Sequence, residues 1–331
     1  MLIQVSFKKN IYMIVVMKFS TILCFGFDRP MHLERMLNSL EKNHESIDSD
    51  VYICIDGPAD STDLEMHSKT VEVAKKNWNF KSTKLILRER NLDCRTNIIN
   101  TITELFKTND RLIILEDDLV LGPNFLSYMN AALHKYLNKK EMWCINGYSY
   151  PQLNFKSGSS VSKYVSPWGW GTWSDRWEIF VNEDYDKKNF ISSLSENDRK
   201  KFNVENLYDW EDIIVKNELG KISAWDAYWY QAVFMNKGLT LYPNKSHIRN
   251  EGFDGTGMHC SSTNDWITPI NMSTTKRYPN KIKLNKLYMF NTLIFYRYYV
   301  LKRYLRFHKS KFSSFKNFRK FLRKKAKDIV S

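Results

Sequence analysis

The feature that most constrains the fold is an alternation of β-rich and helical segments that runs through the chain up to residue 116. Residues 21–27 form a short apolar run that predicts a strand, and residues 30–40 carry apolar side chains at helical spacing. The pattern recurs as far as residues 111–115, a run that is apolar on both faces like a central strand of a parallel sheet covered by helices. Between them we predict strands at 51–55 and 84–87 and helices at 64–78 and 98–106. We therefore expect an α/β fold with a mostly parallel central sheet flanked by helices and with ligands at the carboxyl ends of the strands.

Length and composition limit the domain organisation. The 331 residues suffice for one large domain or two small ones, and a hydrophobic content of 43% with ten tryptophans excludes a chain that is disordered overall. No apolar run approaches the roughly 18 residues of a membrane-spanning helix. Residues 1–17 contain a shorter apolar stretch without a cleavage site, so we interpret them as an N-terminal extension and residues 18–280 as the main domain.

Positive charge is concentrated at the C-terminal end of the chain. The formal net charge is +14, yet residues 281–331 alone hold sixteen Lys and Arg against one acid, so the rest of the protein is nearly neutral. A nucleic-acid-binding domain would spread its basic residues over a folded face, whereas a segregated basic end suits anionic lipid head groups. We expect a basic, aromatic tail that forms a long helix or a disordered arm, an anionic membrane surface as its partner, and no nucleic acid. Five scattered cysteines without a C-x-x-C motif favour the cytoplasm, which places the protein at the inner face of the plasma membrane.

Three consecutive acids, Glu116, Asp117 and Asp118, follow the predicted central strand. Ionised carboxylates at the exit of a buried strand are costly unless a cation compensates them. Hard oxygen ligands suit Mg²⁺ or Mn²⁺, which often holds a diphosphate. The alternative is a helix N-cap at Asp118 ahead of Pro123, and the three acids alone do not separate the two interpretations.

The surroundings of these acids resemble a known family. Residues 114–129 (I-L-E-D-D-L-V-L-G-P-N-F-L-S-Y-M) are similar to the metal motif of GT-A fold glycosyltransferases, especially N-acetylglucosaminyltransferase I and related bacterial surface-polysaccharide sugar transferases. Residues 25–30 (F-G-F-D-R-P) and 55–57 (I-D-G) resemble the first and second nucleotide-binding loops of that family, and Trp143-Cys144 is similar to its next strand. The resemblance is weak at each position but keeps its order over residues 20–262.

The resemblance implies roles for five residues. Arg29 and Asp56 would line the nucleotide pocket, with Asp56 touching the uracil ring. Asp118 would bind the metal directly, while Glu116 and Asp117 position ribose, water and metal. From the residues alone, an Asx turn at Asp56 and a surface position for Arg29 remain open alternatives.

A loop rich in glycine and tryptophan, residues 166–173 (S-P-W-G-W-G-T-W), resembles the loop that shapes the sugar pocket in these enzymes. Glycine permits close backbone approach and indole faces pack against the apolar faces of sugars. The alternative is a tryptophan-rich corner of the core. The pocket residues implied are Trp168, Gly169, Trp170 and Gly171.

The catalytic base is less directly indicated. Residues 225–229 (W-D-A-Y-W) resemble a W-D-D-W segment, but the acid that carries the base role in that pattern is replaced by Ala227. We favour Asp226 as the base because the helix predicted after it would fix its direction, although an N-cap role is the alternative. Asp212 and Glu211 are the other candidates.

A second metal or phosphate contact is implied at His259. The glycine-containing loop at residues 252–260 (G-F-D-G-T-G-M-H-C) resembles a late loop that closes over bound nucleotide, and imidazole can ligate Mn²⁺ or bind phosphate.

These expectations combine into one function. We predict a metal-dependent, inverting glycosyltransferase, a hexosyl- or N-acetylhexosaminyltransferase that uses Mn²⁺ or Mg²⁺. It would move a sugar from a nucleotide diphosphate donor, foremost a UDP-sugar, to a hydroxyl of a surface glycan or a lipid-linked acceptor. A nucleotidyltransferase is the enzymatic alternative, but residues 25–30 lack the Gly-rich phosphate loop that it should carry. A non-enzymatic polybasic protein that binds membranes or nucleic acid is the other alternative, and it leaves the three acids unexplained.

Overall fold

The structure is a computed structural model of the chain. It describes residues 2–6, 12–16, 18–60, 63–151, 158–182, 187–256 and 263–310. The predicted metal or phosphate residue His259 lies outside the described residues, as does the tail beyond residue 310.

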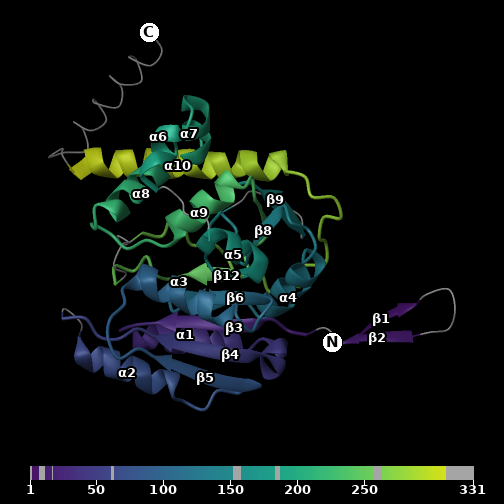
Figure 1. The fold of residues 1–331 in the computed structure, drawn as a ribbon. Helices are drawn as coiled ribbons and strands as arrows, with labels where there is room; N and C mark the ends of the chain where they lie inside the picture. Colours follow the sequence, from purple (N-terminus) through teal and green to yellow (C-terminus); the bar gives the residue numbers. More distant parts are fainter. Residues whose placement is uncertain are drawn as a thin grey trace, which may run out of the picture.

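A single mixed sheet organises the body of the protein (Figure 1). In spatial order its strands are β5 (Ser82–Leu87), β4 (Asp50–Ile55), β3 (Thr21–Gly26), β6 (Arg111–Glu116), β10 (Trp170–Trp173), β8 (Met142–Asn146), β11 (Leu239–Pro243) and β9 (Ser159–Ser162). The first four run parallel, β10 is antiparallel to both of its neighbours, β11 is parallel to β8, and β9 is antiparallel to β11. The predicted α/β class with a mostly parallel central sheet is confirmed.

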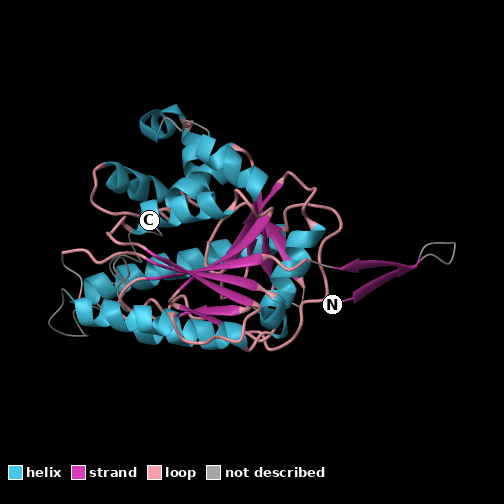
Figure 2. Ribbon diagram, turned by 60° about the horizontal axis from the view of Figure 1, so that its bottom comes forward, coloured by secondary structure: helices cyan, strands magenta, loops and turns pink. Residues whose placement is uncertain are grey.

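Helices lie on both sides of this sheet (Figure 2). They are α1 (Pro30–Glu41), the 3-10 helix η1 (His44–Asp48), α2 (Leu64–Ala74), α3 (Cys94–Leu105), α4 (Phe125–Lys135), α5 (Ser174–Asn182), α6 (Lys187–Ser193), α7 (Glu196–Phe202), α8 (Trp210–Glu218), α9 (Asp226–Met235) and α10 (Lys286–Ser310). The residues at the N-terminal ends explain where several of these helices begin. Pro30 stands at the first position of α1, where its missing N–H is no loss, and the side chains of Asp63 and Asp93 cap α2 and α3.

Among the residues that it describes, the structure contains two further sheets of two strands each. Strand β7 (Leu119–Leu121) pairs antiparallel with β12 (Ile248–Asn250), which brings a segment from late in the chain beside the predicted metal motif. Strands β1 (Leu2–Ser6) and β2 (Tyr12–Val16) form an antiparallel hairpin that projects from the body (Figure 1).

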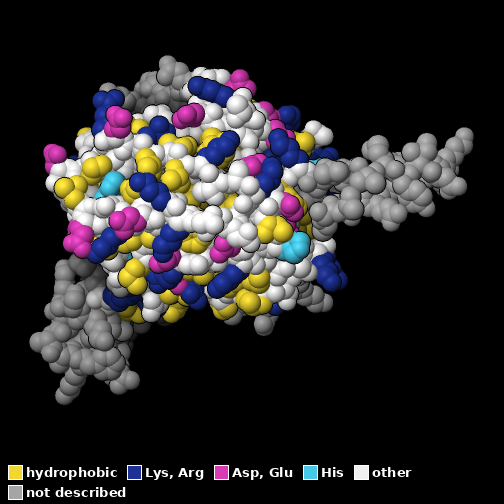
Figure 3. Space-filling model, turned by 90° about the horizontal axis from the view of Figure 1, so that it is seen from below, with side chains coloured by type: hydrophobic (Ala, Val, Ile, Leu, Met, Phe, Trp, Pro, Cys, Tyr) yellow, Lys and Arg dark blue, Asp and Glu magenta, His cyan; other side chains and the backbone are white. Residues whose placement is uncertain are grey.

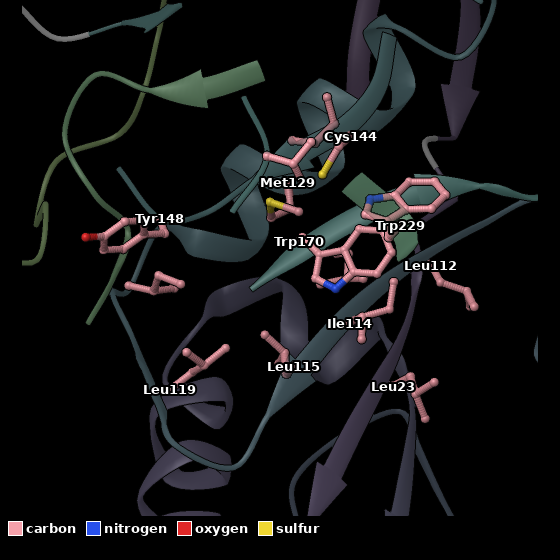
Figure 4. Packing of buried hydrophobic residues seen from close by; sticks show 14 of the residues in the cluster. Leu23, Leu112, Ile114, Leu115, Leu119, Met129, Cys144, Tyr148, Trp170 and Trp229 are labelled. Atoms are coloured by element: carbon pink, nitrogen blue, oxygen red, sulfur yellow. The ribbon is translucent and has the colours of Figure 1, made fainter. Parts of the chain in front are cut away.

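The core is unusually aromatic around β10. Trp170 is 1% exposed and stacks on Trp225 with ring centroids 5.3 Å apart, and Trp229 packs against the same indole at 5.2 Å. Figure 4 shows Trp170 and Trp229 together with Leu112 and Met129 in this packing. Large planar side chains therefore fill the space between the sheet and α9.

Residues 286–310 of the basic C-terminal region form a helix, one of the two alternatives expected from the sequence. One face of α10 is buried against the body through Tyr288, Thr292, Phe295 and Tyr296. The helix therefore completes the hydrophobic core, although it begins beyond the domain boundary predicted at residue 280. Within the part of the chain that the structure describes, no helix combines the length and the hydropathy that crossing a bilayer requires.

Candidate active site

The candidate site lies where three parallel strands end together. Register pairs Phe25 of β3 with Glu116 of β6 and Gly26 of β3 with Ile55 of β4, so the loops that follow these strands start from one edge of the sheet. Loops at the carboxyl ends of parallel strands form the usual ligand crevice of α/β folds. The edge therefore gathers the predicted residues of the nucleotide and metal motifs from three separate stretches of sequence.

Arg29 and Asp117 form the central ion pair of this edge. The Nε atom of Arg29 donates to Oδ2 of Asp117 at 3.1 Å, and Nη2 donates to Oδ1, so the guanidinium meets the carboxylate with two parallel bonds. The same Nη2 lies 3.7 Å from Oδ2 of Asp118. Burial by itself would lower the pKa of Arg29, but the charges of Asp117 and Asp118 raise it above its ordinary value. The Nη1 atom of Arg29 is buried and has no hydrogen-bond partner among the described residues.

The carboxylates outnumber this arginine. Burial raises the pKa of Glu116 well above its ordinary value, and the charges of Asp118, Asp226 and Asp117 raise it further. Burial also raises the pKa of Asp118, to about 6, with the charge of Asp117 adding to the effect and that of Arg29 opposing it. The pKa of Asp117 is likewise raised, chiefly by burial. Such shifts are expected where negative charge exceeds the nearby positive charge, so the edge favours an additional cation.

These residues could hold a divalent cation only with the help of ligands that they do not themselves supply. The described residues contain no group of three or more His, Cys, Asp or Glu side chains arranged to hold a metal ion. Mg²⁺-type sites, however, often use one or two carboxylates and take their other ligands from substrate phosphates and water. Asp117 is committed to Arg29, which leaves Asp118 as the available carboxylate. The backbone of Gly252 lies so close that a Cβ there would overlap Oδ2 of Asp118, which fixes the direction of that side chain.

Asp56 is placed at the end of β4, as predicted, and 5% of the residue is exposed. Its Oδ1 atom accepts from the backbone N–H of Gly57 at 3.0 Å and of Leu92 at 3.1 Å, and Oδ2 accepts from the side chain of Asn91 at 3.3 Å. The carboxylate thus holds the loop after β5 against the loop after β4. A uracil N–H that bonded to Asp56 would have to share or replace one of these contacts.

Asp226, at the start of α9, lies close enough to this cluster for its charge to act on Glu116. It is the first residue of that helix, and the N-cap is Trp225, which makes no capping side-chain bond. Burial raises the pKa of Asp226 to about 6, and its charge contributes to the raised pKa of Glu116. The two alternative bases lie in other contacts: Asp212 pairs with Lys216 at the surface, and Glu211 lies near Arg199 and Asn203.

Contacts from α3 hold the start of α9 in place. Asp93, with φ of 64°, caps α3 by accepting from the backbone N–H groups of Arg95 and Thr96, and the hydroxyl of Ser223 donates to the same carboxylate. Arg95 also lies over the ring of Tyr228, 5.6 Å from its centroid. We did not predict this link. The Asp before the helix could have been recognised as an N-cap, but nothing in the sequence connects it to a loop 130 positions later.

The tryptophan loop divides into two parts. Trp170 and Gly171 belong to β10 and lie inside the core, where a Cβ on Gly171 would meet the backbone of Leu112. Trp168 is only partly buried and packs edge-to-face on Phe253, with ring centroids 5.5 Å apart. Gly169 has φ of 59°, which favours glycine, and a Cβ there would lie 2.9 Å from the side chain of Ile248. Trp168 therefore carries the accessible aromatic surface of this loop.

Two further features near the cluster lie outside the predicted set. His32 on α1 lies 3.0 Å from the carboxylate of Asp254, which ties the start of the late glycine loop to the first helix. A groove of about 430 Å³ runs between α1 and the β7–β12 pair, and no predicted site residue lines it. Its lining includes Arg35 and Arg249, which both pair with Glu251.

Comparison with known proteins gives a partial resemblance. No family model and no curated protein matches the chain. Among solved structures, the mannosyltransferase PcManGT from Pyrobaculum calidifontis, in complex with GDP-Man and Mn²⁺, aligns with a TM-score of 0.38 and 10% identity over 66% of this chain and 73% of its own. S. aureus TarS aligns with a TM-score of 0.31 and 15% identity over 50% of this chain and 30% of its own. Glucosyl-3-phosphoglycerate synthase from Mycobacterium tuberculosis, in complex with Mn²⁺, UDP-Glc and phosphoglyceric acid, aligns with a TM-score of 0.31 and 8% identity over 48% of this chain and 58% of its own.

Proposed function

We propose that the protein is a GT-A glycosyltransferase that moves a sugar from a nucleotide diphosphate to an acceptor hydroxyl. The observation that carries this proposal is the carboxylate-rich edge of the sheet, where Arg29 lies beside Asp118 and the charge of Asp226, on another element, raises the pKa of Glu116. A site with one arginine, one carboxylate that can bind a cation and one carboxylate that can accept a proton has the groups that sugar transfer from a diphosphate needs. The sequence resemblance to N-acetylglucosaminyltransferase I and related bacterial enzymes supports the same reaction.

The donor would bind through its diphosphate. The Nη1 atom of Arg29 is a buried donor without a hydrogen-bond partner among the described residues, and a phosphate oxygen would satisfy it. Asp118 would hold Mn²⁺ or Mg²⁺, which neutralises the charge of the departing diphosphate when it is bound. Asp117 keeps Arg29 in position, and the charges of both act on the buried carboxylate of Glu116. We assign a UDP-sugar as the foremost donor on the position of Asp56.

Asp226 would act as the general base. With a pKa of about 6, the carboxylate is ionised at neutral pH and can accept a proton. This pKa also lies close to neutral pH, where a general base is most effective. It would take the proton of the acceptor hydroxyl while that oxygen attacks the anomeric carbon from the face opposite the diphosphate, which gives inversion. Trp168 would offer its ring to the apolar face of a sugar. We propose a surface glycan or a lipid-linked molecule as the acceptor, and a protein held at the cytoplasmic face of the membrane.

The proposal is tested by measuring nucleotide release from UDP-, GDP-, CMP- and dTDP-sugars with and without Mn²⁺. We expect one donor to be turned over, slowly to water and faster with an acceptor. The Asp118→Asn variant should lose most of this activity, while Asp198→Asn, a change at a surface carboxylate that pairs with Lys201, should keep it. Turnover of nucleoside triphosphates with sugar phosphates, and of no nucleotide-sugar, would refute the proposal in favour of a nucleotidyltransferase.

A further inference from the structure

The C-terminal helix α10 has two apolar faces. The inner face is part of the core, because Tyr288, Phe295 and Tyr296 are at most 6% exposed. Two cations of the helix, Lys302 and Arg306, pair with the buried carboxylate of Asp265. The helix is therefore held in a fixed orientation on the body, and its outer side is exposed to solvent.

A continuous apolar stripe occupies that outer side. Its residues have exposed fractions between 41% and 62%. They follow each other at intervals of three or four positions, which places them along one face of an α-helix. We define the outer stripe by its five members: Leu287, Phe290, Ile294, Tyr298 and Leu301. Isolated exposed apolar residues are common on soluble proteins, but a row of five along four turns is a surface that water disfavours.

Cations border the outer stripe. Arg297 lies three positions after one stripe residue and four before another, and Lys286 lies four positions before Phe290, so both are neighbours of the stripe on the helix surface. No Asp or Glu occurs in the sequence of α10. Figure 3, which views the molecule from the opposite side, shows Lys and Arg interspersed with Asp and Glu on that face. That face is therefore mixed in charge, whereas the sequence of α10 is purely basic.

We propose that the outer stripe of α10 is a membrane-insertion face that lies in the surface of an anionic bilayer. Apolar and aromatic side chains would enter the boundary between head groups and acyl chains, while Lys286 and Arg297 meet the lipid phosphates. A second copy of the chain is a poorer occupant, because pairing two such helices would bring like charges together with no acid in either helix to compensate them.

This geometry extends the expectation from the sequence. A basic tail alone would attract the protein to a membrane without orienting it, whereas a helix docked along one side of the body presents the same face every time (Figure 1). The inference does not depend on the proposed sugar transfer, since its test measures binding to lipid and not turnover. If the transfer proposal also holds, the site would work at a defined position relative to a lipid-linked acceptor.

Binding of the full-length protein to vesicles tests the proposal. Sedimentation with phosphatidylcholine vesicles containing about a third phosphatidylglycerol is compared with sedimentation with phosphatidylcholine alone, at low and high salt. The test variant is Phe290→Ser/Leu301→Ser, and the matched control is Leu64→Ser/Leu219→Ser, which removes two equally exposed apolar side chains elsewhere. Because all four side chains are exposed, circular dichroism and the thermal midpoint should match the wild type.

We expect salt-sensitive binding of the wild type and the control to anionic vesicles, and at least a tenfold weaker binding of the stripe variant. The double variant Lys286→Gln/Arg297→Gln should lose the preference for anionic lipid. Wild-type affinity in the stripe variant would overturn the proposal, since the tail beyond α10 would then suffice. It would also be overturned if the wild type ignored the vesicles, or if light scattering showed a dimer that the stripe variant dissolves into monomers.

Discussion

The replacement Asp226→Asn distinguishes a catalytic role of this carboxylate from a structural one. If the role is catalytic, the variant should have a higher free energy of unfolding and a lower turnover than the wild type. Burial raises the pKa of Asp226 from 3.8 to about 6, so the ionised group is less favourable in the folded protein than in the unfolded chain. One pKa unit corresponds to about 1.4 kcal/mol, so at pH 7.5 the free energy of unfolding is lowered by up to about 3 kcal/mol. An amide of the same shape removes this cost.

The sign of the pH dependence follows from the direction of the shift. Between pH 4 and pH 6 the folded protein binds the Asp226 proton more tightly than the unfolded chain does, so this group's contribution to stability decreases as the pH rises through that range. Urea denaturation should therefore show the Asn variant to be more stable than the wild type at pH 7.5 and equally stable near pH 4. Turnover should fall about 10²-fold or more, as for a lost general base, with donor affinity unchanged.

Two results would refute this reasoning. A variant that is less stable at pH 7.5 would mean that Asp226 supports the start of α9. Unchanged turnover would mean that another group takes the proton, and Asp212 and Glu211 would then be replaced in turn. In the wild type, kcat/KM should fall as the pH decreases through about 6, and the Asn variant should lack this acidic limb.

Three other replacements test the surroundings of the site. Arg29→Met should destabilise the protein by about 3–5 kcal/mol in urea denaturation, because it leaves the buried Asp117 without its partner, and no loss of stability would show that the pair is not structural. Gly252→Ala should cost about 1–3 kcal/mol in stability and weaken Mn²⁺-dependent donor binding in calorimetry, since the added Cβ overlaps Asp118, and unaltered binding would show that Asp118 can move freely. Asp93→Ala should lower the thermal midpoint through the loss of a cap that contributes about 1 kcal/mol and should reduce turnover, whereas full turnover would show that the contact from α3 does not position α9.

The sequence predicted the parallel half of the sheet because that half follows local rules. Strands β3 and β6 are continuous apolar runs, and β3 is followed by α1, whose start is marked by Pro30. The antiparallel insertion of β10 between β6 and β8 could not be predicted in this way. Its pairing is set by packing between segments far apart in the chain, which leaves no periodic signal at Trp170–Trp173.

The site shows the same division. Arg29 and the three acids could be predicted to lie at one edge of the sheet, because each follows a predicted parallel strand and parallel strands bring their carboxyl ends together. The burial and the hydrogen bonds of each side chain could not be predicted from the sequence, because they depend on segments that are distant in the chain. Asp56 is engaged by the loop at residues 91–92, and Trp170 lies in the core although its motif also fitted a pocket.

The account depends on Asp118 binding a divalent cation together with a nucleotide diphosphate. Isothermal titration calorimetry of UDP and GDP into the protein, with and without Mn²⁺, measures this directly. We expect the wild type to bind one of the two nucleotides at least tenfold more tightly with Mn²⁺, and the Asp118→Asn variant to show the same weak binding with and without the metal. Nucleotide binding that Mn²⁺ does not change, or an unaltered response to Mn²⁺ in the Asp118→Asn variant, would contradict the assignment of the site.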